Sequence, residues 1–293
     1  MSYVIIQSNL TKDELFRVFY KVAVFIGFIC LLSLVSAVTG ITINGPAPLD
    51  DPFSKSAFGG YRTGWSNSIF LYVPILFYFY FFSGEKKVKI PSLLAIIGIV
   101  SSQILSGGRA GLIASLFTFL FFTRFKIQNI LILTMVIFFV YNSLGAVTIE
   151  EYFRASENQI ENKEGGSSLD KISSGRVGVY RIGWKLFEKS PLIGNGFSSI
   201  TYETEGPDIH NTLFKRLVDG GLIFVAPMIF LFVSLYNAVI DKTNRYYNGD
   251  NHRVLFRALF FSSIFVSMLE PNYLIGSFQG EAFFWALVCT YLK

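Results

Sequence analysis

Long apolar runs, separated by short polar stretches, fill most of this chain. Several runs approach the roughly 20 residues that a helix needs to cross a hydrocarbon core about 30 Å thick. They do not alternate apolar and polar positions, as the strands of a membrane barrel do, so each is predicted to be a helix. The pattern predicts about eight spans, at residues 18–40, 65–83, 90–106, 110–123, 127–147, 217–239, 254–270 and 274–292.

One long polar segment, residues 148–216, interrupts the apolar runs. A connection of this length is usually functional or disordered. Its first part, residues 157–175, is polar and rich in Gly and Ser, which predicts mobility. Its second part, residues 176–197, begins with an amphipathic helical pattern. The apolar face of that helix is predicted to hold Val179, Ile182, Trp184, Leu186 and Phe187.

The predicted helix ends at Ser190, because a residue that precedes proline avoids the α region and Pro191 follows. Gly194 and Gly196 then predict a turn. The chain is therefore predicted to be an all-α integral membrane protein with about eight transmembrane helices and one large, partly helical extracytoplasmic loop. Its three parts are residues 1–147 with five spans, the loop 148–216, and residues 217–293 with three spans.

Composition strengthens the membrane prediction. Of the 293 residues, 52% are hydrophobic and 15% are charged, whereas globular domains carry about 25% charged residues. The first long apolar run is not followed by a cleavage site of small residues, so no cleaved signal peptide is expected. Cys30 and Cys289 both fall inside apolar runs, where we expect packing roles and neither a disulfide nor a metal site.

The distribution of basic residues predicts the orientation of the spans. A net charge of +5 in a soluble protein would raise the question of nucleic acid. Here the basic residues gather in short loops. Short loops that are rich in Lys and Arg are cytoplasmic in most membrane proteins. Residues 84–89, 123–126 and 241–253, the last containing His252, are expected in the cytoplasm with the N-terminus. The connections 41–64, 106–111, 148–216 and 271–273 then face outward.

Arginines at the outward ends of the spans are candidates for chemistry. Ionisable groups at membrane depth are costly and are treated as functional hypotheses. Arg109 and Arg62 would also fit as bases that snorkel to the interface. Arg176 and Arg181 would project about 140° apart on a helix, so only one is expected to point into a shared pocket. A solvated helix face is the alternative for both.

His210 and Asn211 stand together just before an apolar run. A histidine titrates near neutral pH and suits removal of a hydroxyl proton, although a polar interfacial residue at a helix start is the alternative. Arginine forks suit phosphate oxygens. A histidine and several arginines at an outward bilayer surface therefore point to a lipid-linked phosphate substrate, from which the attached group can be transferred.

The sequence lacks the common signatures of metal and nucleotide sites. No HExxH, CxxC or G-x-x-x-x-G-K-[ST] motif occurs, and Asp50 and Asp51 lack the spacing of a DxD pair. We therefore expect no metal, no cofactor and no nucleic-acid partner. The energy for a transfer would come from the substrate itself, such as a pyrophosphate leaving group.

Three stretches resemble the O-antigen polymerase and O-antigen ligase superfamily of bacterial envelope glycosyltransferases. SGGRAGLIASLFTF at 106–119 resembles the family's Ser-x-Ser-Arg-Ala-Gly helix entry. SGRVGVYRIGWKLFEKSPLIGNGF at 174–197 resembles its SGR…W…P-L-x-G-x-G block in the long outer loop. HNTLFKRLVDGGLIF at 210–224 resembles its His-Asn-x-x-L-x-x-L-x-x-x-G block before the next span. Their order and their spacing across one outer loop make the set specific.

The resemblance implies a donor glycan on undecaprenyl pyrophosphate and an inverting, metal-independent transfer. Carried over by motif, Arg109 and Arg176 would hold the pyrophosphate. His210 would activate the acceptor hydroxyl or assist departure of the pyrophosphate. Arg181 would be auxiliary, and Asn211 would fix the orientation of the histidine. To these we add Arg62 and Glu281 as further candidates for substrate binding.

The resemblance also implies partners and a location. The donor is expected to meet a glycan or lipid A core acceptor in the lipid of the bacterial inner membrane, with the site facing the periplasm. A flippase and a chain-length regulator are further expected partners. Two departures stand out: Gly108 replaces a common serine, and Asp219 stands where glutamate is frequent. Only three predicted spans precede the helix entry, so we expect a compact member, one that lacks its first helices, or half of a split gene.

Several functions stay open at this stage. The leading hypothesis is a polymerase that joins lipid-linked oligosaccharide repeats into O-antigen or capsule polysaccharide. The close alternative is a ligase that moves finished polymer onto the lipid A core of lipopolysaccharide or another acceptor. A polysaccharide-lipid transporter would use charges near the bilayer midplane, for which Glu281 and Glu270 are candidates. A scaffold without chemistry would tolerate loss of His210.

Overall fold

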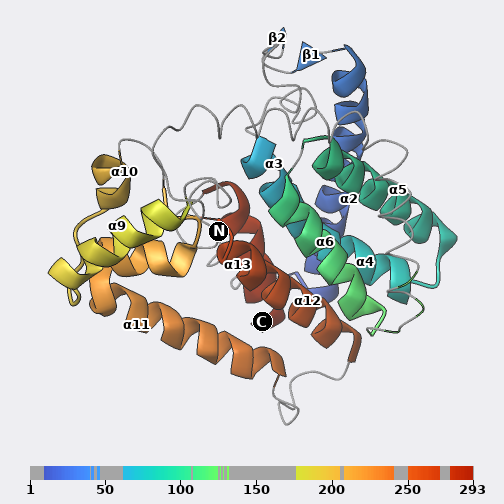
Figure 1. Ribbon diagram of the computed structural model, residues 1–293. Helices are drawn as coiled ribbons and strands as arrows, with labels where there is room; N and C mark the ends of the chain where they lie inside the picture. Colours follow the sequence, from blue (N-terminus) through green and yellow to red (C-terminus); the bar gives the residue numbers. More distant parts are fainter. Residues whose placement is uncertain are drawn as a thin grey trace. The chain divides into compact units, whose positions relative to one another are not determined.

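The computed structural model describes residues 10–39, 41–42, 45–46, 62–106, 108–124, 126, 128, 131, 176–204, 208–240, 250–270 and 278–292. Within these residues the fold is helical apart from one short antiparallel strand pair, β1 (Ile41–Thr42) and β2 (Gly45–Pro46), in which Ile41 pairs with Pro46 (Figure 1). The predicted helical class therefore holds for the described residues, with this strand pair as an addition within the connection 41–64.

Two compact units make up the fold, and each is described by itself. The first comprises Met1–Arg124 and Val233–Lys293, and the second comprises Phe125–Phe232. Helices of the first unit are α2 (Lys12–Thr39), α3 (Arg62–Ile69), η2 (Phe70–Tyr72), α4 (Val73–Phe82), α5 (Lys86–Leu105), α6 (Arg109–Phe122), α12 (Asp250–Ser267) and α13 (Phe278–Leu292). The second unit holds α9 (Arg176–Lys189), α10 (Ser199–Glu203) and most of α11 (Thr212–Ile240).

In the first unit, α2 packs along α5 at short range because glycines line the crossing. A Cβ added at Gly27 would overlap Ala95, and one added at Gly98 would overlap the Gly27 carbonyl oxygen. Small residues at such crossings let helix backbones approach closely, as is typical of helices packed in a membrane. α6 packs against α3, α4 and α12 in the same unit (Figure 1).

His252 departs from the expected loop role. It lies in α12, where its ring stacks on Phe16 with centroids 5.0 Å apart. Its Nε2 lies 2.9 Å from the hydroxyl of Tyr78. The sequence interpretation failed here because the polar residues just before the apolar run form the first turn of the helix. Those residues therefore pack in the first unit.

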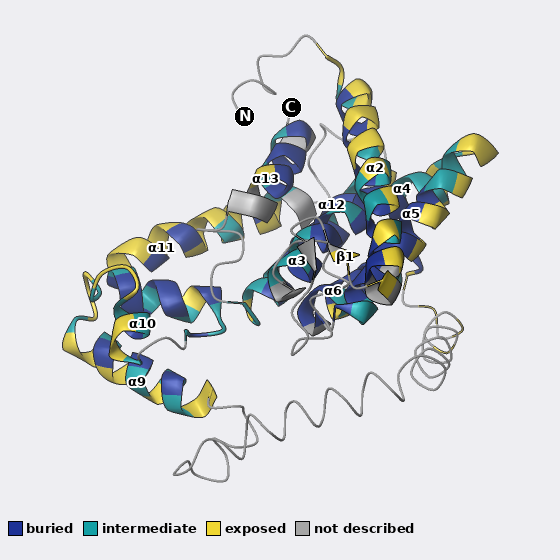
Figure 2. Ribbon diagram, turned by 90° about the horizontal axis from the view of Figure 1, so that it is seen from above, coloured by how far each residue is buried: buried dark blue, intermediate teal, exposed yellow. Residues whose placement is uncertain are grey.

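Among the residues that the structure describes, four helical segments are long and apolar enough to cross a membrane. They are Lys12–Ser33, Gly64–Phe82, Lys86–Leu105 and Thr212–Ala238. These correspond to four of the eight predicted spans. Figure 2 shows exposed residues along much of α11, whereas the described residues of α12 and α13 are mostly buried or of intermediate burial.

The remaining four predicted spans are not confirmed. The apolar helix Ala110–Phe122 is shorter than a span, because the 14 residues of α6 rise only about 21 Å. α12 and α13 have 18 and 15 residues, and neither is among the four segments. The predicted span 127–147 and the predicted mobile stretch 157–175 lie outside the described residues, apart from two isolated positions of the former.

Candidate functional site

The helix predicted in the outer loop is present as α9, and its end is where proline predicts it. Val179, Gly183 and Leu186 are buried at the spacing of one helix face. The helix ends at Lys189, just before Ser190 and Pro191. Trp184, however, was placed on the apolar face and is 51% exposed, and its Nε1 donates to Glu188 Oε1 at 2.7 Å. An indole can meet water through such a polar contact, so its size alone was a poor guide to burial.

A small apolar core joins α9 to the segments that follow it in the chain. Its buried members are Val179, Leu186, Ile200, Ile209 and Val218. Tyr180, Ile182, Phe187 and Phe214 pack against this core. The chain therefore brings the second and third family-like motifs together in one folded unit, although the residues in contact lie about 30 positions apart.

The turn predicted at Gly194 and Gly196 lies against a break in α11. Gly221 interrupts that helix with φ 63° and ψ −167°, so the carbonyl groups before it lack helical partners. The loop supplies them: Asn195 N–H donates to Val218 O and Gly196 N–H donates to Asp219 O, both at 2.9 Å. The Asn195 side chain also donates to Leu186 O at 2.8 Å, which ties the loop to α9.

Two glycines are required by this close approach. Gly194 has φ 72° and Gly221 has φ 63°, a region that favours glycine. A Cβ at Gly194 would also overlap the Asp219 carbonyl, and one at Gly221 would overlap the Leu192 carbonyl. The glycines of the two motifs therefore allow the same close approach between the loop after α9 and the break in α11. From the sequence, Gly194 was predicted only as part of a local turn.

His210 sits immediately before α11, on a backbone that is fixed from two sides. The Tyr180 hydroxyl donates to the His210 carbonyl oxygen at 2.9 Å. Burial raises the pKa of Tyr180, so this phenol keeps its proton for that hydrogen bond at neutral pH. Tyr180 also stacks on Phe214 with centroids 5.4 Å apart and planes 2° apart. His210 as a whole residue is half-buried, and its ring Nδ1 is buried.

Asn211 caps the helix that follows. Its Oδ1 accepts the Phe214 N–H at 2.9 Å, the contact of an N-cap residue. The family-derived expectation was that Asn211 orients the histidine. The described contacts give its oxygen a backbone partner instead, so any effect on the His210 ring would act through the backbone.

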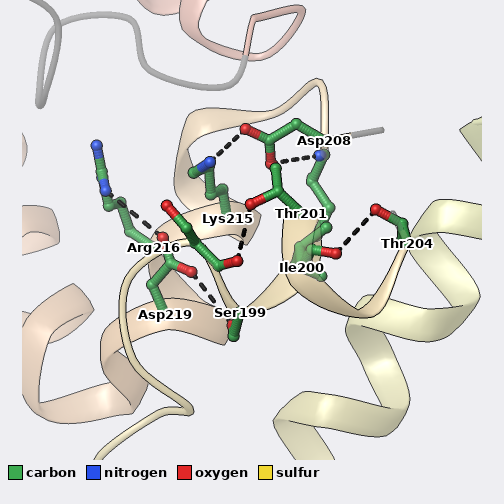
Figure 3. Close-up of polar contacts among 10 residues, drawn as sticks. Ser199, Ile200, Thr201, Thr204, Asp208, Lys215, Arg216 and Asp219 are labelled. Carbon is green, nitrogen blue, oxygen red and sulfur yellow. Dashed lines mark hydrogen bonds and ion pairs between the residues drawn. The ribbon is translucent and has the colours of Figure 1, made fainter. Parts of the chain in front are cut away.

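Four charged residues that were not among the predicted site residues surround this helix start. Lys215 pairs with Asp208, and their side chains are 6% and 18% exposed. Arg216 Nη1 lies 3.6 Å from Asp219 Oδ2, and both of these side chains are buried. The Ser199 hydroxyl donates to Asp219 Oδ1 at 3.4 Å (Figure 3). The i, i+3 spacing of Arg216 and Asp219 inside an apolar stretch was the available signal.

The aromatic ring of Phe197 adds a further contact to this group. The Arg216 guanidinium lies 5.8 Å from the centre of the Phe197 ring, within the range of a cation–π contact. The Asp208 carboxylate also accepts the Ile209 N–H at 2.8 Å. The Asp208–Lys215 pair therefore links the two ends of the segment that carries His210, whereas Arg216 and Asp219 link α11 to Phe197 and Ser199.

The arginines of α9 are both accessible. Arg176 is the first residue of the helix, and its side chain and that of Arg181 are exposed. A helix N-terminus exposes unpaired N–H groups and carries partial positive charge, so it favours an anion. No acidic residue stands in the first turn of α9 to neutralise that end. Arg176 is thus in a position suited to a phosphate, whereas Arg181 lies further along the helix.

Arg109 opens α6 above a buried polar network in the first unit. Ser66 Oγ donates to Gly108 O at 2.8 Å, directly before the arginine. Gln103 Nε2 donates to Ser66 O at 3.1 Å, and Ser115 Oγ donates to Gln103 Oε1 at 2.9 Å. These bonds hold the start of α6 against α3 and α5. The side chain of Arg109 lies outside the described part of the structure.

Gln103→Leu is expected to destabilise this helix start. The change leaves the buried Ser115 hydroxyl and the Ser66 carbonyl without the amide, at a cost of about 2 kcal/mol. Thermal unfolding in detergent would measure it. Ile113→Val, at an exposed position of α6, is the matched control. Equal melting temperatures for both variants would show that the network contributes nothing to stability.

The remaining two candidates also belong to the first unit. Arg62 opens α3 and Glu281 lies in α13. Their side chains lie outside the described part of the structure, so their expected contacts with substrate stay predictions. Among the residues that the structure describes, no three His, Cys, Asp or Glu side chains gather as a metal site would. Cys30 is buried and Cys289 is half-buried, and both are free thiols.

A family model described as O-antigen ligase matches residues 93–229. The match runs from α5 into α11 and includes Arg109, Arg176 and His210. No curated protein matches the chain. The resemblance to the O-antigen polymerase and ligase superfamily is thereby confirmed. Together with the apolar helices, the match indicates a membrane protein with an O-antigen ligase or polymerase type of function.

Proposed function

We propose that this protein is a membrane glycosyltransferase that joins lipid-linked oligosaccharide repeats into a surface polysaccharide. The donor is a glycan on undecaprenyl pyrophosphate, and the acceptor is the free end of another lipid-linked glycan. The site faces the periplasm from the bacterial inner membrane. The observation that carries the proposal is the fold of the second unit, in which the α9 motif, the glycine loop and the His-Asn helix start meet around His210.

The chemistry assigned to His210 is that of a general base. Its imidazole takes the proton of the acceptor hydroxyl as that oxygen attacks the anomeric carbon of the donor sugar. The bond between this carbon and the phosphate oxygen breaks, and its electron pair leaves with undecaprenyl pyrophosphate. The configuration at the anomeric carbon is thereby inverted. The backbone around His210 is held by Tyr180 and by the cap of Asn211. A base fixed in this way is pre-organised for one geometry of attack.

The leaving pyrophosphate carries the charge that the arginines are proposed to hold. Arg176, exposed at the N-terminus of α9, offers a guanidinium fork beside the N–H groups of the helix. Arg109 is proposed for the same ligand because it opens the helix of the first motif. Arg181, Arg62 and Glu281 are proposed as auxiliary contacts with the glycan or the phosphates.

Arg176→Ala is expected to raise the apparent KM for the lipid-linked donor by about tenfold or more, because charge-assisted hydrogen bonds to the phosphate are lost. Arg176→Lys should rescue only part of this, since lysine is a point charge and not a fork. Initial rates against donor concentration would measure both changes. Lys185→Ala removes another exposed base of α9 and should leave KM unchanged. An unaltered KM in Arg176→Ala would remove this residue from the phosphate site.

The second candidate function is that of an O-antigen ligase, which the description of the matching family favours. The two reactions share the donor and differ in the acceptor. We would supply the reconstituted protein with the lipid-linked oligosaccharide of its own host, alone and with lipid A core. A ladder of lengthened lipid-linked chains in both reactions supports the polymerase. Label that moves only onto lipid A core makes the protein a ligase, and no transfer to either acceptor contradicts both.

A further inference from the structure

The loop after α9 and the turn after the α11 break expose a continuous set of apolar side chains. On the loop, Leu192, Ile193 and Phe197 are 61%, 71% and 73% exposed. Large apolar residues in a loop normally turn inward, so three exposed ones in six positions require a partner surface. The set, named here the apolar rim, consists of Leu192, Ile193, Phe197, Leu222, Ile223 and Phe224.

Backbone hydrogen bonds fix the two halves of the apolar rim to each other. Leu222 N–H donates to Pro191 O at 2.9 Å, and Ile223 N–H donates to Leu192 O at 3.1 Å. The rings of Phe197 and Phe224 meet edge to face with centroids 6.3 Å apart. The loop therefore moves with the start of the second part of α11 as one surface.

The two segments that form the apolar rim carry no charged residue of their own, and the Arg216 guanidinium that lies 5.8 Å from the Phe197 ring belongs to a buried side chain. Residues 190–200 and 220–240 contain no Asp, Glu, Lys, Arg or His. Helix α9, in contrast, presents exposed charged side chains from its start to its end, among them Arg176, Lys185 and Lys189. The unit thus has one strongly charged element and one apolar, uncharged edge, as a protein at a lipid–water boundary has.

The position of the apolar rim next to a candidate membrane span indicates which surface it contacts. After the break at Gly221, residues 222–240 continue as 19 helical residues, about 28 Å in length and close to the roughly 30 Å of a hydrocarbon core. They belong to a candidate span, and Phe230 on that span is 74% exposed. The rim is the first turn of this segment together with the loop bonded to it, so it lies at one end of the candidate span.

We propose that the apolar rim inserts into the lipid leaflet at the His210 end of the span and sets the depth of the second unit at the bilayer surface. The partner is the lipid surface itself. The insertion stands on its own observations. Its use rests on the proposed function, because His210 and the start of α9 would then lie at the level of a lipid-linked pyrophosphate, whose phosphates occupy the headgroup region.

Site-directed fluorescence tests the depth directly. In a Cys289→Ala background, with the buried Cys30 left in place, single cysteines Ile193→Cys and Phe197→Cys would carry an environment-sensitive dye in liposomes. Lys185→Cys on α9 and Glu203→Cys on α10 are matched exposed controls in the same unit. Each label would be quenched with nitroxide-labelled lipid and, separately, with iodide in the water. Gel filtration would confirm that each labelled protein is folded.

We expect the two rim labels to be quenched several-fold more by nitroxide lipid, and several-fold less by iodide, than the two controls. Rim labels that iodide quenches as strongly as the controls would overturn the proposal, because the rim would lie in water. Rim labels shielded from both quenchers would also overturn it, and would assign the rim to contact with protein. The readout uses no donor or acceptor, so failure of the proposed reaction leaves this test unaffected.

Discussion

His210→Ala is expected to abolish glycan transfer while leaving the protein folded. A positioned base contributes roughly 10²–10⁴-fold to a rate, and its loss should lower the turnover number by a factor in that range. The surrounding backbone should persist, because Tyr180 bonds to the carbonyl of His210 and the cap is made by Asn211, neither of which uses the imidazole. Initial rates of chain elongation at saturating donor would measure the effect, with thermal unfolding alongside.

The other histidine of the chain provides the matched control. His252 stacks on Phe16 and contacts Tyr78 in the first unit, so His252→Ala should lower the melting temperature. Its turnover per folded molecule should match that of the native protein. A native turnover number in His210→Ala would remove the assigned base, whatever happens in the control.

Lys215→Met is expected to disrupt the second unit. The change leaves the Asp208 carboxylate without its ion-pair partner at a site where the lysine side chain is only 6% exposed. Removing one partner of a buried ion pair lowers the free energy of unfolding by about 3 kcal/mol or more, whereas replacing both partners often lowers it far less. The double variant Asp208→Asn with Lys215→Met should therefore recover much of the loss. The stability of the native protein, of Lys215→Met and of the double variant would be measured by protease protection of residues 176–220 and by thermal unfolding.

The exposed base Lys185 is the control for this comparison. Lys185→Met should change stability by less than about 0.5 kcal/mol, as surface substitutions generally do. If Lys215→Met proves no more damaging than Lys185→Met, then the ion pair is not what holds the His210 segment to α11. Additive effects in the double variant would lead to the same conclusion.

Local rules predicted the parts of the site that depend on neighbouring residues. The spacing of Val179 and Leu186 predicted the buried face of α9, Pro191 predicted its end, and Gly194 with Gly196 predicted the turn. Each of these features follows from backbone sterics or helical periodicity within a few residues. Trp184 was misplaced because an amphipathic ring satisfies the same periodicity whether it faces the core or the water.

Contacts between residues far apart in the chain could not be predicted from local sequence patterns. The carbonyls of Val218 and Asp219 accept bonds from a loop more than 20 residues earlier, and Gly221 breaks a run that reads as one uninterrupted apolar helix. The span predicted to begin at residue 217 therefore contains a helix break. The burial of Lys215 was missed for a similar reason, since its partner Asp208 lies across the cap and not on the same helix.

The short helices set a different limit. The predicted spans 110–123 and 274–292 stay unconfirmed, because α6 has 14 residues and the described part of α13 has 15. Helix length is decided by caps and by tertiary contacts, such as the bond from Ser66 to the Gly108 carbonyl. The family-like motifs were more robust, because they combine residue identity with order along the chain.

The proposed transfer reaction is tested most directly by measuring how much undecaprenyl pyrophosphate, the leaving group, is released. Purified protein in liposomes would receive radiolabelled lipid-linked donor with a chelator and without nucleotide, and both undecaprenyl pyrophosphate and new glycosidic bonds would be quantified over time. The account predicts one pyrophosphate lipid released for each bond formed, with release lost in His210→Ala. Donor recovered unchanged, release without bond formation, or bond formation that requires added nucleotide would contradict it.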